Sequence, residues 1–244
     1  MTIPQDHPRY RSLLVRERLA GYVRDGVVSP EGLIAHGRGE AFDYLIGETT
    51  TKSAALAEKT AAAMLRSARH PVISVNGNTA ALAAREIAGL QQASGAIVEV
   101  NLFHRTEERV QKISRLLEAN GVTVLSGKAE RILPLSHDRA LSYPEGTGNA
   151  DVILVPLEDG DRCEALRTMG KTVIAIDLNP LSRTARMASL TVVDEVTRAL
   201  PMITGFFSTL QEQEIEMLKE APDNRYFLTE AMIEMNRRLA HALD

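Results

Sequence analysis

The chain has 244 residues, of which 44% are hydrophobic and 4% aromatic, and its formal net charge is −4. This length can bury the core of one substantial domain or two small ones. The acidic balance and the lack of a long basic run argue against a nucleic-acid partner, and no apolar run reaches the roughly 18 residues of a membrane span.

The first 70 residues show helical patterns. Residues 8–25 predict an amphipathic helix, residues 29–48 two short helices joined through Gly37 and Gly39, and residues 51–69 an alanine-rich helix. The N-terminus is polar and lacks the apolar core of a signal peptide, so we expect a cytoplasmic protein.

From residue 71 onward, short apolar runs alternate with helical patterns. The runs predict buried strands at 71–76, 96–103, 121–125, 150–156, 171–177 and 191–194. Strands that alternate with helices indicate an α/β protein, with a parallel sheet covered by helices on both faces. Residues 136–149 are predicted as the one long loop, and the chain from Pro201 as helical with a break at Pro222.

Ligands of open α/β sheets bind beyond the carboxyl ends of the strands. The segment VNGNTAAL (75–82) follows the first strand, where Gly77 permits a tight turn and Asn78 is a good N-cap. Free N–H groups at such a turn can hold an anion, although an ordinary strand-to-helix turn has the same pattern. Neither G-x-G-x-x-G nor a P-loop motif occurs, which disfavours a dinucleotide-dependent oxidoreductase and excludes a P-loop enzyme.

The segment IDLNPLSRTARMA (176–188) combines an acid with an arginine after a strand. Asp177 can accept two ribose hydroxyls, Asn179 is a candidate N-cap, and Pro180 suits the first position of a helix. Arg183 follows within about a turn. The alternative is that Asp177 and Asn179 only cap a helix and that Arg183 is a solvated surface charge.

Three acids follow the strand at 150–156. Glu158, Asp159 and Asp161 can bind Mg²⁺ together with substrate phosphates, or hold an ammonium group. The alternative is that these acids only favour a helix N-terminus. The single cysteine, Cys163, is interpreted as a buried, inert thiol.

The segment GLIAHGRGEAFDYLIGE (32–48) places Arg38 between two glycines, where it can approach a phosphate or carboxylate as a two-pronged donor. Glu40 and Asp43 lie three residues apart on one helical face, which can orient Arg38 or receive a cationic group. His36 can be a site residue, but a packed histidine fits equally well. No metal-binding His/Cys spacing and no G-x-S-x-G motif occurs.

Six segments in order resemble the archaeal 4-phosphopantoate–β-alanine ligases, also called phosphopantothenate synthetases. The resemblance covers about residues 3–200. The segments are IPQDHPRYRSL, GLIAHGRGEAFDYLIGE, VISVNGNTAAL, NLFHRTEERV, VPLEDGDR and AIDLNPLSRTARMA.

The resemblance implies a Rossmann-like fold, a homodimer, an archaeal source and a role in coenzyme A biosynthesis. The implied reaction joins 4-phosphopantoate to β-alanine, with ATP and Mg²⁺, and releases AMP and diphosphate through an acyl-adenylate. We expect a single ligase domain in which an N-terminal helical segment (1–50) adds to the site of a Rossmann-like core (70–195), followed by C-terminal helices (200–244). A non-catalytic nucleotide-binding regulator, or a ligase that uses pantoate or releases ADP, remains an alternative.

The resemblance also implies a nucleotide site drawn from several segments, in which three arginines act on the phosphates. Its residues are Arg16, Arg38, Asp177, Leu178, Asn179, Arg183 and Thr184, with Asp194 and Glu195 nearby. For the acid's phosphate or carboxylate we expect the turn at Asn76, Gly77 and Asn78, with His36 close by. Glu40, Asp43 and Asp159 are the candidates for the amine of β-alanine.

Overall fold

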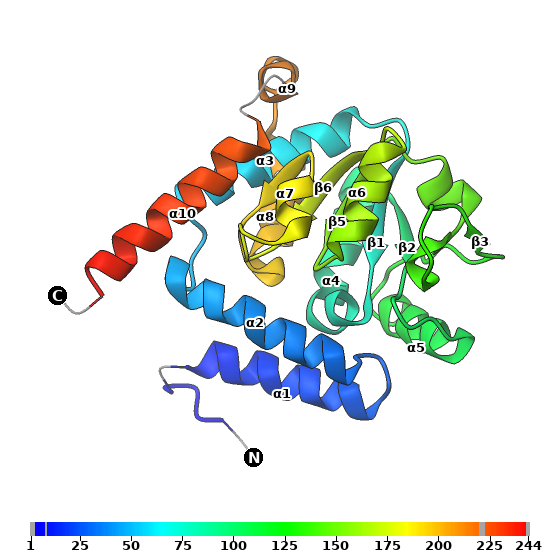
Figure 1. The fold of residues 1–244 in the computed structure, drawn as a ribbon, viewed down its shortest axis with the longest axis horizontal. Helices are drawn as coiled ribbons and strands as arrows, with labels where there is room; N and C mark the ends of the chain where they lie inside the picture. The colour runs from blue at the N-terminus through cyan, green and yellow to red at the C-terminus, as the bar shows by residue number, and fades with distance from the viewer. Residues whose placement is uncertain (1–2, 8, 220–222, 243–244) are drawn as a thin grey trace.

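The computed structural model describes residues 3–7, 9–219 and 223–242. Its centre is a five-stranded, all-parallel sheet in the order β2-β1-β5-β6-β7 (Figure 1). The Rossmann-like α/β class expected from the sequence is therefore confirmed. The strands are β1 (Pro71–Val75), β2 (Ile97–Val100), β5 (Val152–Pro156), β6 (Thr172–Ile176) and β7 (Leu190–Val192).

Helices cover both faces of this sheet. Because successive side chains of a strand point to opposite faces, Val72 and Ile73 enter two different apolar clusters. The first cluster lies against α3 (Lys52–Ser67), α4 (Gly77–Ser94), α5 (Glu107–Glu118) and α8 (Val196–Thr209). The second lies against α6 (Gly160–Thr168) and the segment that carries β3 (Glu130–Arg131) and β4 (Leu141–Ser142).

Five further helices complete the described chain (Figure 1). They are α1 (Tyr10–Arg24), α2 (Pro30–Ile46), α7 (Arg183–Met187), α9 (Glu212–Lys219) and α10 (Asn224–Ala240), of which α7 closes the second face. The first two pack against each other and against α4. No helix within the described ranges is long and apolar enough to cross a membrane.

The prediction of two short helices over residues 29–48 is wrong, because α2 is continuous from Pro30 to Ile46. Ser29 accepts a hydrogen bond from the Gly32 amide at 3.2 Å, and Gly47 ends the helix with φ +80°. Internal glycines lower helix stability by about 1 kcal/mol each, but unlike proline they keep every backbone hydrogen bond.

Three other predictions need correction. Residues 121–125 form only an isolated bridge between Val124 and Val98, not a sheet strand. The predicted loop at 136–149 contains a 3₁₀ turn (Asp138–Ala140), β4 and a π turn (Pro144–Gly148). Pro201 lies inside α8, which starts five residues earlier, and the predicted break at Pro222 falls outside the described residues.

Gly77, rather than a glycine of α2, marks the tightest backbone approach near the sheet edge. A Cβ atom at Gly77 would lie 2.2 Å from the backbone oxygen of Val27, in the α1–α2 connection. At Gly37 a Cβ atom would meet nothing within 4 Å. The absence of a side chain at Gly77 is therefore what lets the α1–α2 hairpin dock on α4.

We predict opposite effects for the two alanine substitutions. Gly77→Ala should lower the free energy of unfolding by about 1–3 kcal/mol, because the docked backbone must move. Gly37→Ala should raise it by about 0.5–1 kcal/mol, because alanine favours a helix interior and has room there. Urea unfolding of both variants measures this, and equal effects would contradict the close approach at Gly77.

Candidate functional site

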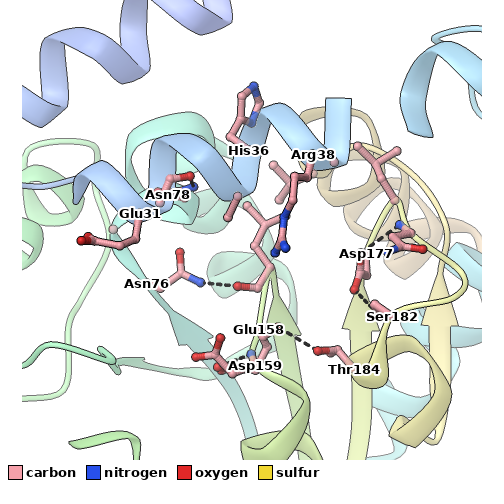
Figure 2. Close-up of a pocket in the computed structure, with 18 of the residues that line it drawn as sticks. Glu31, His36, Arg38, Asn76, Asn78, Glu158, Asp159, Asp177, Ser182 and Thr184 are labelled. Carbon is pink, nitrogen blue, oxygen red and sulfur yellow. Dashed lines mark hydrogen bonds between the residues drawn. The ribbon is translucent and has the colours of Figure 1, made fainter. Parts of the chain in front are cut away.

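A cavity of about 920 Å³ lies beyond the carboxyl ends of the strands. This is near the upper end of the roughly 300–1,000 Å³ typical of small-molecule sites. Its walls come from α2, the first turn of α4 and the connections that follow β1, β5, β6 and β7 (Figure 2). The polar lining includes His36, Arg38, Asn76, Gly77, Asn78, Arg109, Arg139, Glu158, Asp159, Asp177, Asn179, Ser182, Arg183, Thr184, Asp194 and Glu195.

Arg38 descends from α2 into the space between the ends of the strands (Figure 2). Asp177 lies at the end of β6, and its carboxylate accepts hydrogen bonds from the Asn179 amide at 2.9 Å and the Ser182 hydroxyl at 2.5 Å. Burial raises the pKa of Asp177, while these two bonds and the charge of Arg38 act in the opposite direction. Asp177 thus both organises the turn and faces Arg38 across the cavity.

The turn after β6 differs from the predicted capping pattern. Helix α7 is capped by Ser182, whose hydroxyl accepts from the Ala185 amide at 2.9 Å, so Asn179 and Pro180 precede the helix. Asn179 accepts instead from the Leu181 amide at 2.9 Å. Arg183 lines the cavity, pairs with Glu164 and leaves 62% of its side chain exposed.

Asn76, and not Asn78, caps α4. Its side-chain oxygen accepts from the Thr79 amide at 3.0 Å, and its amide nitrogen donates to the Leu157 carbonyl at 2.8 Å. The Asn78 side chain donates to the Gly32 carbonyl of α2 at 2.7 Å. The side chains of both asparagines therefore hold the walls together, and the first turn of α4 offers an anion its backbone N–H groups.

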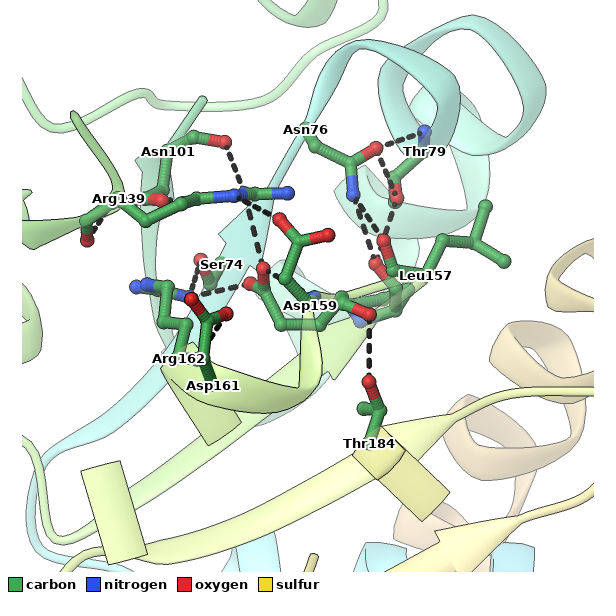
Figure 3. A network of polar contacts seen from close by, with 12 residues as sticks. Ser74, Asn76, Thr79, Asn101, Arg139, Leu157, Asp159, Asp161, Arg162 and Thr184 are labelled. Carbon is green, nitrogen blue, oxygen red and sulfur yellow. Dashed lines mark hydrogen bonds and ion pairs between the residues drawn. The ribbon is translucent and has the colours of Figure 1, made fainter. Parts of the chain in front are cut away.

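The connection after β5 contains a polar network (Figure 3). Leu157 has φ +54°, an uncommon value for a side-chain-bearing residue, and it turns its carbonyl toward Asn76. Glu158 follows, buried between Arg139 at 3.1 Å and Arg162 at 2.5 Å. Burial by itself raises the pKa of Glu158, but the two guanidinium groups lower it below its usual value.

These pairings disfavour a metal site, which was one of the alternatives for the three acids after β5. Glu158 is taken by two arginines, Asp159 pairs with Arg139 at 2.7 Å, and Asp161 contacts His137 at 2.6 Å. Within the described residues, no group of three His, Cys, Asp or Glu side chains is placed to hold a metal ion.

Sequence reasoning missed Arg109 and Arg139. The Arg139 guanidinium donates to the Asn101 carbonyl at 2.9 Å as well as to Asp159, and it extends toward Asn76 at the cavity (Figure 3). Burial and the nearby charge of Arg139 lower the pKa of Arg109. The available signal was the position of Arg139 in the one long predicted loop, since long loops often carry function.

Other predicted residues lie around the cavity in different ways. Arg16 and Glu40 form a bidentate pair, with contacts of 2.8–3.0 Å, and neither lines the cavity. The His36 ring points away from Arg38 and the strand ends (Figure 2), and burial lowers its pKa. Leu178 is buried at the cavity wall, and the Thr184 hydroxyl donates to the Glu158 carbonyl at 2.8 Å.

Asp194 and Glu195 connect β7 to α8 at the rear of the cavity. Asp194 is buried and pairs with Arg198 at 2.5 Å, and the same guanidinium reaches Asp43 on α2 at 2.5 Å. Glu195 accepts from the Thr197 amide at 2.8 Å and so caps α8, and burial raises its pKa. Burial also raises the pKa of the Cys163 thiol to about 12, in agreement with an inert thiol.

Fold and cavity define a Rossmann-like α/β protein with its ligand cavity beyond the carboxyl edge of a parallel sheet. The family described as phosphopantothenate/pantothenate synthetase matches residues 53–238. The chain is 60% identical to the 4-phosphopantoate–β-alanine ligase of Methanospirillum hungatei, over 99% of this chain and 100% of the relative. The corresponding ligases of Methanosarcina mazei and Thermococcus kodakarensis are 52% and 46% identical, over 97% and 98% of this chain and 95% and 94% of theirs. The chain belongs to the phosphopantothenate/pantothenate synthetase family.

Glu158→Gln should lower the free energy of unfolding by about 3–5 kcal/mol at pH 7, because two buried guanidinium groups lose their counterion. The folded-state pKa of Glu158 is depressed, so its contribution is complete above the unfolded-state pKa and is lost as the pH falls through the folded-state value. Urea unfolding from pH 7 down to pH 3.5 should show the difference between the two proteins shrinking below the ordinary glutamate pKa of 4.5.

Glu164→Gln is the matched control, because it removes an exposed partner of Arg183. It should change the free energy of unfolding by no more than about 0.5 kcal/mol. Similar losses of unfolding free energy in the two variants would contradict the stabilising role of Glu158 between its two buried arginines.

Proposed function

We propose that this protein is a ligase that condenses 4-phosphopantoate with β-alanine to 4'-phosphopantothenate, using ATP and releasing AMP and diphosphate, in coenzyme A biosynthesis. The names of the relatives support the overall reaction. The observation that carries the assignment to this cavity is Arg38, which points from α2 into the space between the strand ends and opposite Asp177 (Figure 2).

In the first step, the carboxylate of 4-phosphopantoate attacks the α-phosphorus of ATP, and diphosphate leaves. Both reactants are anions, so the cavity must lower their mutual repulsion. Arg38 and Arg183 are suited to the phosphates of ATP, and Asp177 to its ribose. Fixed donors that face developing charge are usually the largest catalytic contribution.

The acid substrate needs a second group of donors, on the other side of the cavity. The N-terminus of α4 at Gly77 supplies backbone amides, and Arg109 and Arg139 lie at the same end of the lining. This end suits the phosphate or carboxylate of 4-phosphopantoate. Two neighbouring subsites on opposite walls of the cavity, one for ATP and one for 4-phosphopantoate, would hold the two reactants in an orientation that favours attack.

In the second step, the amine of β-alanine attacks the acyl carbon, AMP leaves, an amide bond forms and the amine loses a proton. Of the three candidate carboxylates, Glu40 is paired with Arg16 and Asp43 with Arg198, and neither lines the cavity. Asp159 lines the cavity and keeps 42% of its side chain exposed. We therefore assign the amine to Asp159.

Magnesium does not fit a site made of protein side chains alone, because the acids after β5 are paired with cations. Arg16 remains a predicted ATP contact, and a contact with ATP in this cavity would require the ion pair between Arg16 and Glu40 to open.

We further propose that the protein is a homodimer. The exposed apolar side chains of Ile233 and Leu239 on α10 support this proposal, and sedimentation equilibrium would test it.

A product assay separates this function from its alternatives. Purified protein is incubated with ATP, β-alanine and either 4-phosphopantoate or pantoate, and nucleotides are resolved chromatographically. AMP and diphosphate formed only with 4-phosphopantoate support the proposal. ADP formation or a preference for pantoate would indicate a related ligase, and no turnover with either acid would indicate a nucleotide-binding regulator.

Arg38→Ala should lower kcat for AMP formation by about 100- to 1,000-fold, by analogy with the loss of one preorganised donor. The side chain is exposed at the cavity, so the thermal unfolding midpoint should stay within a few degrees of wild type. Arg167→Ala, which removes an exposed arginine of α6 outside the cavity lining, is the control and should retain full activity. Full activity of Arg38→Ala would rule out its role.

A further inference from the structure

Glu58 is a buried acid of α3 that the proposed chemistry does not use. Its side chain is 0% exposed, and neither of its carboxyl oxygens has a hydrogen-bond donor among the described residues. An isolated carboxylate in such surroundings is costly, and proteins avoid the cost by pairing the charge or by keeping the proton. Glu58 lacks a direct cationic partner among the described ion pairs.

The neighbouring carboxyl that acts on Glu58 is that of Asp194, which follows β7, a strand packed against α3. Asp194 is well supplied as an anion, since it accepts from the Thr50 hydroxyl at 2.5 Å, from Arg198 at 2.5 Å and from the Glu195 amide at 2.7 Å. Two adjacent buried carboxyl groups do not both ionise. Because the donors all serve Asp194, the proton between the two groups belongs to Glu58.

This pair lies directly behind the wall of the cavity. Asp194 contributes to the lining, and the guanidinium of Arg198 joins it to Asp43 of α2. Helix α2 also carries Arg38. A hydrogen bond from Glu58 to Asp194 therefore supports the contact that attaches α2 to the rear of the cavity.

We propose that Glu58 is a positioning residue that is protonated at neutral pH, donates a hydrogen bond to Asp194 and thereby holds the Asp194–Arg198–Asp43 bridge, and with it the nucleotide side of the cavity, in the binding geometry. The inference rests on the proposed function for the identity of the ligand. Loss of this proton would place two carboxylates side by side and weaken the bridge.

The surrounding charges agree with a neutral Glu58. Burial and the negative charge of Asp194 raise the pKa of Glu58 to about 9, and Arg198 only partly opposes them. Charges on the other packed helices have their own partners. Glu214 of α9 pairs with Lys59, and Glu234 of α10 pairs with Arg237 and Arg238.

The first test follows the proton during unfolding. The folded-state pKa of Glu58 is raised, so its proton is released on unfolding between about pH 4.5 and 9, and stability falls with rising pH over that range. Urea unfolding of wild type and Glu58→Gln should show a difference in pH slope equal to one proton, whereas Glu118→Gln, an exposed control on α5, should match wild type. Equal slopes for wild type and Glu58→Gln would overturn the proposal.

The second test measures ATP binding by calorimetry at pH 8 and pH 10. If only the protonated form binds well, the Kd of wild type should rise about tenfold between these pH values. Glu58→Gln keeps a neutral donor, so its Kd should rise far less, while every other titrating group is shared. Glu58→Met keeps the volume but has no donor, and it should bind ATP weakly already at pH 8.

The two failures are distinguishable. No ATP binding by wild type at pH 8 would overturn the proposed nucleotide site together with this inference. Normal binding at pH 8, with the same loss at pH 10 in wild type and Glu58→Gln, would overturn only the role of Glu58.

Discussion

The cavity depends on one buried carboxylate held between two guanidinium groups. Glu158 leaves the end of β5, and its pairs with Arg139 and Arg162 join the central strand to the long connection after β2 and to α6. Burying any one of these charges alone would cost several kcal/mol, so the three are placed as a unit. The unit in turn fixes Arg139 against Asn101 and Asp159.

The charges around the cavity divide into two groups by burial. Behind the walls, arginines match the charge of Glu158, Arg198 matches those of Asp43 and Asp194 and, as we infer, a proton neutralises Glu58. At the cavity itself, Arg38 and Arg183 are exposed. Exposed cations can exchange water or a weak surface pair for a phosphate at little cost. A chain of net charge −4 can in this way receive two anionic substrates.

The sheet and most helices could be predicted from the sequence, because a strand buried on both faces must be an uninterrupted apolar run. The wrong predictions of the helix cap and of the strand have the same cause, which is that contacts with distant parts of the chain decided the outcome. Asn76 and Asn78 are equally good caps locally, and contacts with distant segments distinguish them: Asn76 donates to the carbonyl of Leu157, whereas Asn78 donates to the carbonyl of Gly32. Residues 121–125 are as apolar as a strand, yet the sheet edge provides them with a single bridge at Val98.

By itself, the sequence determined the α/β class, the collinear motifs of the family and the segments that meet at the carboxyl edge, since these depend on local patterning and on order along the chain. Only the tertiary structure decided which charged side chains are paired with one another and which remain available to a ligand. It paired Arg16 with Glu40, bound Glu158 and Asp159 to arginines, brought Arg139 into the cavity and left Glu58 without a hydrogen-bond donor among the residues that the structure describes. Pairing and burial depend on distances between residues far apart in the chain, which no local pattern encodes.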